Sequence, residues 1–127
     1  MKIPQQYLPV MPYLILSDAK AFLNFTTTVF GANPQLIDRD ENNQIRHGEI
    51  RIGDAVIMFG QSGKNWAVKP AAMFIYVEDV DKTYDAGLRQ KAISLMPPEK
   101  KDYGYTAGFE DIFGNQWCWC KAIKFLS

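Results

Sequence analysis

The sequence reads Leu14-Ile15-Leu16-Ser17-Asp18, and 61 residues further on it reads Ile75-Tyr76-Val77-Glu78-Asp79. Both stretches are typical of the apolar end of a strand followed by an acidic residue that caps a helix. The same offset of 61 separates Gly53 from Gly114, and each glycine ends one run of alternating residues and opens another. The sequence therefore predicts two copies of one structural unit.

The first copy is expected to have the order β-α-β-β-β. Ser17 or Asp18 caps the helix, and Gly31 suits the position just after its end. Alternating residues predict strands at 11–16, 35–38, 45–52 and 55–59.

The second copy repeats this order. Its helix starts at Asp79 and carries Val80, Tyr84 and Leu88 on one face, and its strands are expected at 72–77, 93–96, 106–112 and 116–121. A long loop is expected from Pro97-Pro98 to Tyr105. One helix covers one face of each sheet, so the other face is free to line a pocket.

Length and composition indicate one α+β domain spanning residues 1–127. We expect module one at about 8–60, a linker at about 61–70 and module two at about 71–122. The 14 basic and 14 acidic residues balance, so the chain has no basic field for nucleic acid or an anionic membrane. Without a leader or a long apolar run, we expect a cytoplasmic protein. Cys118 and Cys120 are then expected to be reduced thiols.

Several short motifs, in this order and spacing, resemble the small glyoxalase-like proteins of the vicinal oxygen chelate superfamily, which includes glyoxalase, bleomycin-resistance and dioxygenase relatives. The resemblance covers nearly the whole chain. It implies paired βαβββ modules, a concave sheet cleft and a homodimer. The residues that carry it are Pro12-Tyr13-Leu14 with Asp18, Phe30-Gly31-Ala32, Arg51-Ile52-Gly53-Asp54, Tyr76-Val77-Glu78-Asp79-Val80-Asp81, Met96-Pro97-Pro98, Tyr103-Gly104-Tyr105-Thr106-Ala107-Gly108-Phe109 and Asp111-Ile112-Phe113-Gly114-Asn115-Gln116-Trp117.

Enzymes of that superfamily hold a divalent metal through side chains on the first and last strand of each module. The resemblance places these positions at Met11, Ile57, Ala72 and Cys118. Three of the four offer only hydrocarbon or thioether, whereas divalent ions take oxygen, imidazole or thiolate ligands. We therefore expect no metal site and no cofactor, although a displaced divalent metal stays open.

Side chains alternate along strands, so residues two apart share a face. This predicts a cleft lined mainly by apolar and aromatic side chains, with Trp66, Tyr103 and Tyr105 reaching it from loops. Trp117 and Trp119 are expected under the helices. The predicted ligand-binding residues are Tyr13, Ile57, Phe59, Trp66, Phe74, Tyr76, Tyr103, Tyr105 and Cys118.

The candidate catalytic residues are His47, Glu49 and Glu110. His47 and Glu49 share a face of the strand at 45–52, and Glu110 follows Glu49 by the repeat offset. An imidazole beside a carboxylate is a plausible proton-transfer pair. The alternative, that these groups form ordinary structural ion pairs, stays open.

The leading functional hypothesis is a metal-free protein that holds an apolar or aromatic small molecule, as the bleomycin-resistance branch of the superfamily sequesters its drug. An enzyme of lyase, isomerase or dioxygenase type is the first alternative. It would use His47 and Glu49 as acid and base, or a displaced metal on His47, Glu49, Glu110 or Cys118. An interaction module with a filled cleft is the second alternative.

Overall fold

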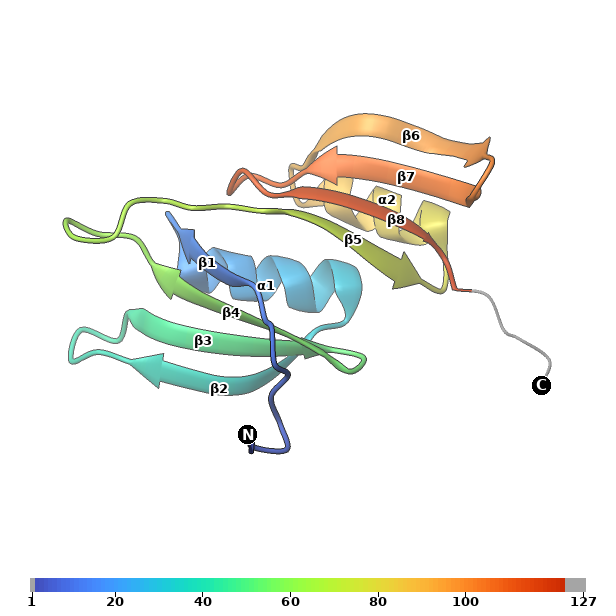
Figure 1. Cartoon of the computed structure of the whole chain (residues 1–127). Helices are drawn as coiled ribbons and strands as arrows, with labels where there is room; N and C mark the ends of the chain where they lie inside the picture. Colours follow the sequence, from blue (N-terminus) through green and yellow to red (C-terminus); the bar gives the residue numbers. More distant parts are fainter. Residues whose placement is uncertain (1, 123–127) are drawn as a thin grey trace. The chain divides into compact units, whose positions relative to one another are not determined.

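A computed structural model describes residues 2–122 of the chain, which divide into two compact units. Unit 1 ends at Pro70 and unit 2 begins at Ala71. Each unit is a four-stranded sheet with one helix in the order β-α-β-β-β (Figure 1). The predicted α+β fold of two βαβββ modules is confirmed.

Unit 1 consists of β1 (Tyr13–Leu16), α1 (Ala19–Phe30), β2 (Asn33–Arg39), β3 (Ile45–Ile52) and β4 (Ala55–Gln61). The strand order in its sheet is β1-β4-β3-β2. The outer strand β1 runs parallel to β4, and the other neighbours are antiparallel.

The ends of α1 follow from the residues that flank it. The Asp18 side chain accepts the backbone N–H of Ala21 at 3.0 Å, and Gly31 follows the helix with a φ of 66°, where a residue without Cβ is favoured. The side of α1 that faces the sheet carries Phe22, whose ring lies 5.1 Å from that of Phe59 on β4. The core of unit 1 therefore lies between α1 and one face of the sheet.

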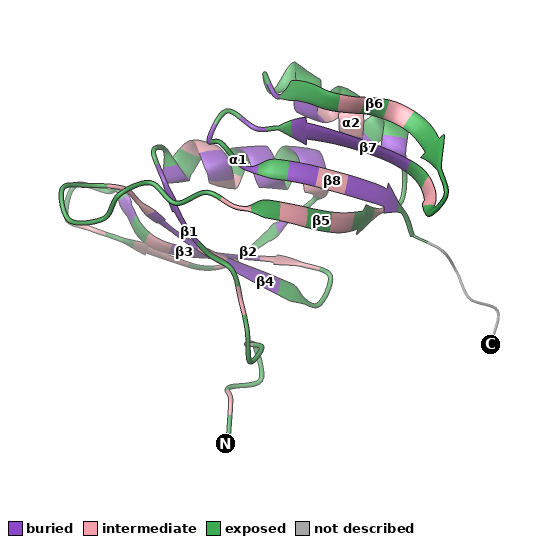
Figure 2. Ribbon diagram, turned by 45° about the horizontal axis from the view of Figure 1, so that its top comes forward, coloured by how far each residue is buried: buried purple, intermediate pink, exposed green. Residues whose placement is uncertain are grey.

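Unit 2 consists of β5 (Ala72–Val77), α2 (Val80–Arg89), β6 (Ile93–Lys101), β7 (Gly104–Glu110) and β8 (Gln116–Lys121). Its strand order, β5-β8-β7-β6, repeats that of unit 1. In Figure 2 most of β7 and half of β8 are buried, whereas the edge strand β6 is mostly exposed.

Trp117 and Trp119 lie buried on the α2 side of the second sheet, as predicted. The Trp119 indole N–H donates to the carbonyl of Val80 in α2 at 3.2 Å. The sequence analysis placed Val80, Tyr84 and Leu88 together on one face of this helix. The prediction is wrong for the buried face of α2, on which Thr83 and Gly87 lie with Val80. Phe109 lies directly against Gly87, which has no side chain to keep the sheet away. Tyr84 instead reaches outward and donates to Ser94 at 2.7 Å, and Leu88 is exposed.

The prediction of a long loop between Pro97 and Tyr105 is also wrong. β6 continues through both prolines to Lys101, and only the two residues Asp102 and Tyr103 separate it from β7. A strand tolerates proline where its N–H is not needed for pairing. β6 meets this condition because it is an edge strand and its pairing with β7 is irregular between Met96 and Glu99.

The loop between β7 and β8 is held by the buried carboxylate of Asp111. Asp111 accepts the backbone N–H of Phe113 and of Asn115, each at 2.9 Å. Its second oxygen accepts the Asn115 amide at 3.0 Å and the Trp117 indole N–H at 2.8 Å. These four donors compensate the burial of the charge.

The two helices of the described residues have 12 and 10 residues, and neither is long and apolar enough to cross a membrane.

Candidate functional site

The face of the first sheet that points away from α1 carries the polar side chains of β3. Tyr13 on β1 pairs with Met58 on β4, and Met58 pairs with Glu49 on β3, so the three side chains form one row. His47 and Arg51 flank Glu49 at alternate positions and share this face. We call it the open face of unit 1.

Ile57 and Phe59 do not lie on the open face, so the prediction that their side chains line the cleft is wrong. Both are buried on the α1 side, Phe59 against Phe22. The residue opposite Tyr13 is Met58, not Ile57 or Phe59. Because side chains alternate, a shift of one residue moves the whole strand to the other face.

The reason for this error is that the repeat offset is not constant. A two-residue turn, Gly53 and Asp54, joins β3 to β4, whereas five residues join β7 to β8. The row in unit 2 that corresponds to Tyr13, Met58 and Glu49 is Phe74, Cys118 and Gly108. The structural counterpart of Glu49 is therefore Gly108, and the prediction that Glu110 occupies that place is wrong. Glu110 is the exposed last residue of β7.

Glu49 is buried, with 2% of its surface exposed, and three side chains donate to its carboxylate. The Tyr7 hydroxyl lies 2.9 Å from Oε1 and 3.1 Å from Oε2. The Gln35 amide lies 3.1 Å from Oε1, and His47 Nε2 lies 2.8 Å from Oε2. Arg51 in turn donates to Gln35 Oε1 at 2.9 Å, which fixes the amide in the orientation that donates to Glu49.

Opposing effects act on the pKa of Glu49. Burial raises it, but the hydrogen bonds from His47, Gln35 and Tyr7 and the charge of His47 together lower it below its usual range. The hydrogen bond to Glu49, burial and the charge of Glu49 all raise the pKa of Tyr7. Glu49 is therefore a carboxylate at neutral pH, and Tyr7 is a neutral donor.

An ionised carboxylate only accepts hydrogen bonds, so His47 Nε2 carries a proton and donates a hydrogen bond to Glu49. The other ring nitrogen, Nδ1, lies 3.2 Å from the Tyr13 hydroxyl. In the neutral imidazole Nδ1 is the acceptor of that hydroxyl. Glu49, His47 and Tyr13 thus form a chain of hydrogen bonds from the buried carboxylate to a half-exposed phenol.

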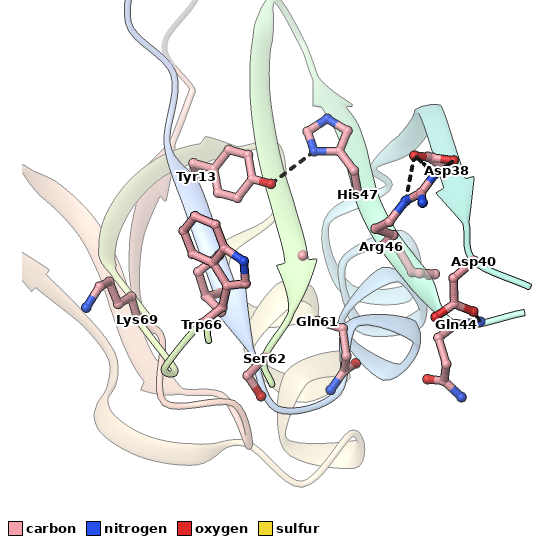
Figure 3. A pocket seen from close by; sticks show the side chains of 13 residues that line it. Tyr13, Asp38, Asp40, Gln44, Arg46, His47, Gln61, Ser62, Trp66 and Lys69 are labelled. Atoms are coloured by element: carbon pink, nitrogen blue, oxygen red, sulfur yellow. Dashed lines mark hydrogen bonds and ion pairs between the residues drawn. The ribbon is translucent and has the colours of Figure 1, made fainter. Parts of the chain in front are cut away.

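This chain ends at a pocket of about 700 Å³ that lies entirely within unit 1. Figure 3 shows the ring of Tyr13 pointing from β1 toward His47, with the Trp66 indole beside Tyr13. Trp66 lies on the segment that follows β4 and exchanges backbone hydrogen bonds with Gly63. The lining residues are Tyr13, Ile15, Asp38, Asp40, Gln44, Ile45, Arg46, His47, Gly60, Gln61, Ser62, Trp66 and Lys69.

Three of the predicted site residues, Tyr13, His47 and Trp66, therefore meet at one pocket, with Glu49 behind His47. Phe74 and Tyr76 are exposed on β5 of unit 2, where their rings form an edge-to-face pair at 5.4 Å. Cys118 is a half-buried free thiol opposite Phe74.

The loop positions predicted for Tyr103 and Tyr105 are corrected by the short turn between β6 and β7. Tyr103 is exposed in that turn. Tyr105 belongs to β7, on the α2 side of the sheet, and its hydroxyl donates to Asp81 at 2.7 Å. Tyr105 is therefore not a loop residue that can cover a pocket.

The metal-binding chemistry implied by the resemblance does not fit these residues. The register of unit 1 places Met58 on the open face, where the sequence analysis expected Ile57. A thioether therefore lies there in place of a hydrocarbon. Neither offers the oxygen, imidazole or thiolate that a divalent ion takes. Within residues 2–122 no three His, Cys, Asp or Glu side chains are grouped to hold a metal.

The sequence analysis missed Tyr7, Gln35 and the backbone of Gln6. Arg51 donates to the Gln6 carbonyl at 2.8 Å, so the segment before β1 is attached to β3 next to Glu49. This segment has no alternating or helical pattern, and nothing in the sequence indicates which strand it meets. For Gln35 the only signal was its place in a predicted strand.

The lowered pKa of Glu49 predicts a pH dependence of stability. A carboxyl whose pKa is lower in the folded than in the unfolded state stabilises the fold above the unfolded value, about 4.3, and loses this contribution as pH falls through the folded value. We expect the free energy of unfolding to fall on acidification, and to fall less in Glu49→Gln. Denaturant titrations from about pH 6 to about pH 3 measure this difference. An unchanged acid slope in Glu49→Gln would contradict it.

Comparison with known proteins gives a consistent family and fold. Residues 8–119 match the model of the Glyoxalase/Bleomycin resistance protein/Dioxygenase superfamily. No curated protein sequence matches the chain.

Solved structures with the same fold share few residues with the chain. TioX from Micromonospora sp. ML1 is 20% identical, with a TM-score of 0.70 over 90% of this chain and 99% of TioX. Protein PA1353 from Pseudomonas aeruginosa is 17% identical, with a TM-score of 0.74 over 91% and 98%. The fosfomycin resistance protein FosX from Mesorhizobium loti is 17% identical, with a TM-score of 0.66 over 96% and 95%.

Proposed function

Because the chain belongs to the Glyoxalase/Bleomycin resistance protein/Dioxygenase superfamily, whose members include resistance proteins as well as enzymes, we propose that it binds an aromatic or apolar small molecule without a divalent metal. The site is the pocket on the open face of unit 1. The observation that carries the proposal is that Tyr13 and Trp66 are exposed there beside His47.

The size and lining of the pocket support a small-molecule ligand. Its volume of about 700 Å³ lies within the range that drug-sized ligands occupy. Trp66 is 66% exposed and Tyr13 is 50% exposed, so both rings offer apolar surface that a bound molecule would remove from water. Flat aromatic ligands are expected to bind most tightly here, because a pair of aromatic rings contributes about 0.5–1.5 kcal/mol beyond the free energy gained by burying their surface.

The donor chemistry supports binding without a metal. Three of the four positions that the resemblance assigns to metal ligands carry hydrocarbon or thioether side chains, and Cys118 alone offers a thiolate. Of the groups considered for a displaced site, only His47 and Glu49 belong to unit 1, and they already bond to each other. Binding in the pocket is therefore expected to be insensitive to a chelator.

The proposal predicts that Trp66→Ala weakens binding of an aromatic ligand about tenfold, which corresponds to about 1.4 kcal/mol. A panel of aromatic and aliphatic compounds is first screened by the rise in melting temperature with EDTA present. The affinity of each hit is then measured by calorimetry for the wild type and Trp66→Ala.

Tyr103→Ala is the matched control, because it removes an aromatic ring of similar exposure, 61%, from unit 2. We expect it to leave the affinity unchanged. Equal losses in both variants would place the site elsewhere. Hits that bind only after a metal is added would contradict the metal-free proposal.

Acid–base catalysis is a second candidate function, favoured by the 2.8 Å contact between His47 and Glu49. The carboxylate holds Nε2 of the imidazole, and Nδ1 lies 3.2 Å from the Tyr13 hydroxyl, so His47 can exchange a proton with a bound molecule through that hydroxyl. If a ligand found in the screen is converted to a product, His47→Ala is expected to abolish turnover. Full turnover in that variant would exclude the role.

A further inference from the structure

The hydrogen-bond chain from Glu49 reaches the pocket at His47 and ends there at the hydroxyl of Tyr13. The Glu49 carboxylate fixes the proton of His47 on Nε2, which leaves Nδ1 directed at Tyr13. Tyr13 is half exposed, whereas Glu49 is closed off from solvent. A bound molecule can therefore reach the oxygen of Tyr13 but not the carboxylate.

We propose that Tyr13 and His47 take up a proton from an acidic hydroxyl group of the ligand, so that the pocket selects phenols and binds them as phenolates. This inference rests on the proposed function, because it names the class of aromatic molecule that the same pocket takes.

The proton transfer is balanced and needs no further reactant. The ligand O–H bond breaks as its proton passes to the oxygen of Tyr13, and the Tyr13 O–H bond breaks as its proton passes to Nδ1 of His47. The products are a phenolate, an unchanged Tyr13 and an imidazolium. In the imidazolium form Nε2–H still donates to the Glu49 carboxylate, 2.8 Å away, so the charged ring is paired with an opposite charge.

The other charged groups that line the pocket are compatible with a bound anion. Asp38, which pairs with His47 across the strands, is neutralised by Arg46 at 3.0 Å. Asp40 accepts the backbone N–H groups of Asn42 and Gln44, each at 2.9 Å, and so is held in the turn after β2. Lys69 adds a positive charge to the lining.

Two probes separate this inference from the proposed function. 4-Nitrophenol has an acidic hydroxyl group, and its anion absorbs visible light. 4-Nitroanisole has the same ring but no hydroxyl proton. We measure the affinity of the full chain for both, the phenolate absorbance on binding, and the NMR signal of His47, which needs no assignment because the chain has one histidine.

The wild type is expected to bind 4-nitrophenol about tenfold more tightly than 4-nitroanisole, the size of one hydrogen bond to a charged group. The phenolate band should rise and the His47 signal should move to its imidazolium position. Tyr13→Phe and His47→Gln should each remove the preference and keep the affinity for 4-nitroanisole. Tyr84→Phe, which removes a hydroxyl bonded to Ser94 in unit 2, should leave the preference intact.

Tyr13→Phe deletes one hydroxyl from a side chain that is half exposed, so the test does not depend on whether His47→Gln folds. Equal affinity for the two probes without a shift of the His47 signal would overturn the inference and leave the proposed function standing. A preference that survives in Tyr13→Phe would also overturn it. If neither probe binds up to its limit of solubility, both the inference and the proposed aromatic pocket are wrong.

Discussion

Replacing Glu49 by alanine is expected to lower the free energy of unfolding by about 3 kcal/mol, because a buried hydrogen-bonded charge is lost and its donors are stranded. Tyr7, Gln35 and His47 all donate to this carboxylate. Once it is gone, the Gln35 amide faces a space that its side chain cannot fill. Denaturant unfolding of the full chain at neutral pH measures the loss.

Glu110→Ala is the matched control for this prediction. Glu110 has the same side chain on the third strand of its own unit but is exposed at the end of β7. Its removal should change the stability by less than about 0.5 kcal/mol. If the two variants lose similar amounts, the hydrogen bonds of Glu49 do not stabilise unit 1 as described.

The second large effect is expected at Gly87, where alanine should also cost about 3 kcal/mol. A Cβ at this position would overlap the ring of Phe109, which is itself fully buried and lies 4.5 Å from the Trp119 ring. In an exposed helix the same change stabilises by about 1 kcal/mol. The sign of the change in unfolding free energy therefore tests the close approach of α2 to the sheet.

Gly63→Ala serves as the control for Gly87→Ala, because a Cβ at Gly63 would meet no atom within 4 Å. We expect its effect to stay within about 0.5 kcal/mol. A stabilised Gly87→Ala would show that α2 packs against the second sheet differently.

The repeat of the strand end and helix cap was enough to predict the fold, because it depends on local signals. Asp18 and Asp79 both accept a backbone N–H three residues on, as a helix cap does. The third strand of the first unit also alternates polar His47, Glu49 and Arg51 with less polar residues, as expected of a sheet with one covered face. These features need no knowledge of distant contacts.

The faces of the last strands could not be predicted in the same way. Which side Ile57 and Phe59 face depends on the pairing of Tyr13 with Met58, and this register depends on the lengths of two different turns. A single residue of error moved Phe59 from the core to the predicted cleft. The contacts of Tyr7 with Glu49 are equally beyond a local pattern, because 42 residues separate them.

The partial success at the site has a physical basis. His47 and Glu49 were predicted because polar residues alternate along β3, and Tyr13 because it lies two residues after Met11 on the same face of the first predicted strand. Trp66 was predicted because it lies in the loop between the two modules, and binding residues are often found in loops. The sequence could not show that all three rings meet at one pocket, because the segment after β4 turns back through the bridge between Gly63 and Trp66.

The most direct test of the aromatic pocket is an NMR titration that follows the imidazole signal of His47, the single histidine of the chain, as aromatic compounds are added. We expect at least one compound to move this signal in a saturable way, and to do so at about tenfold higher concentration in Trp66→Ala. Compounds that raise the melting temperature yet leave the His47 signal in place would bind elsewhere, which would contradict the assignment of the pocket.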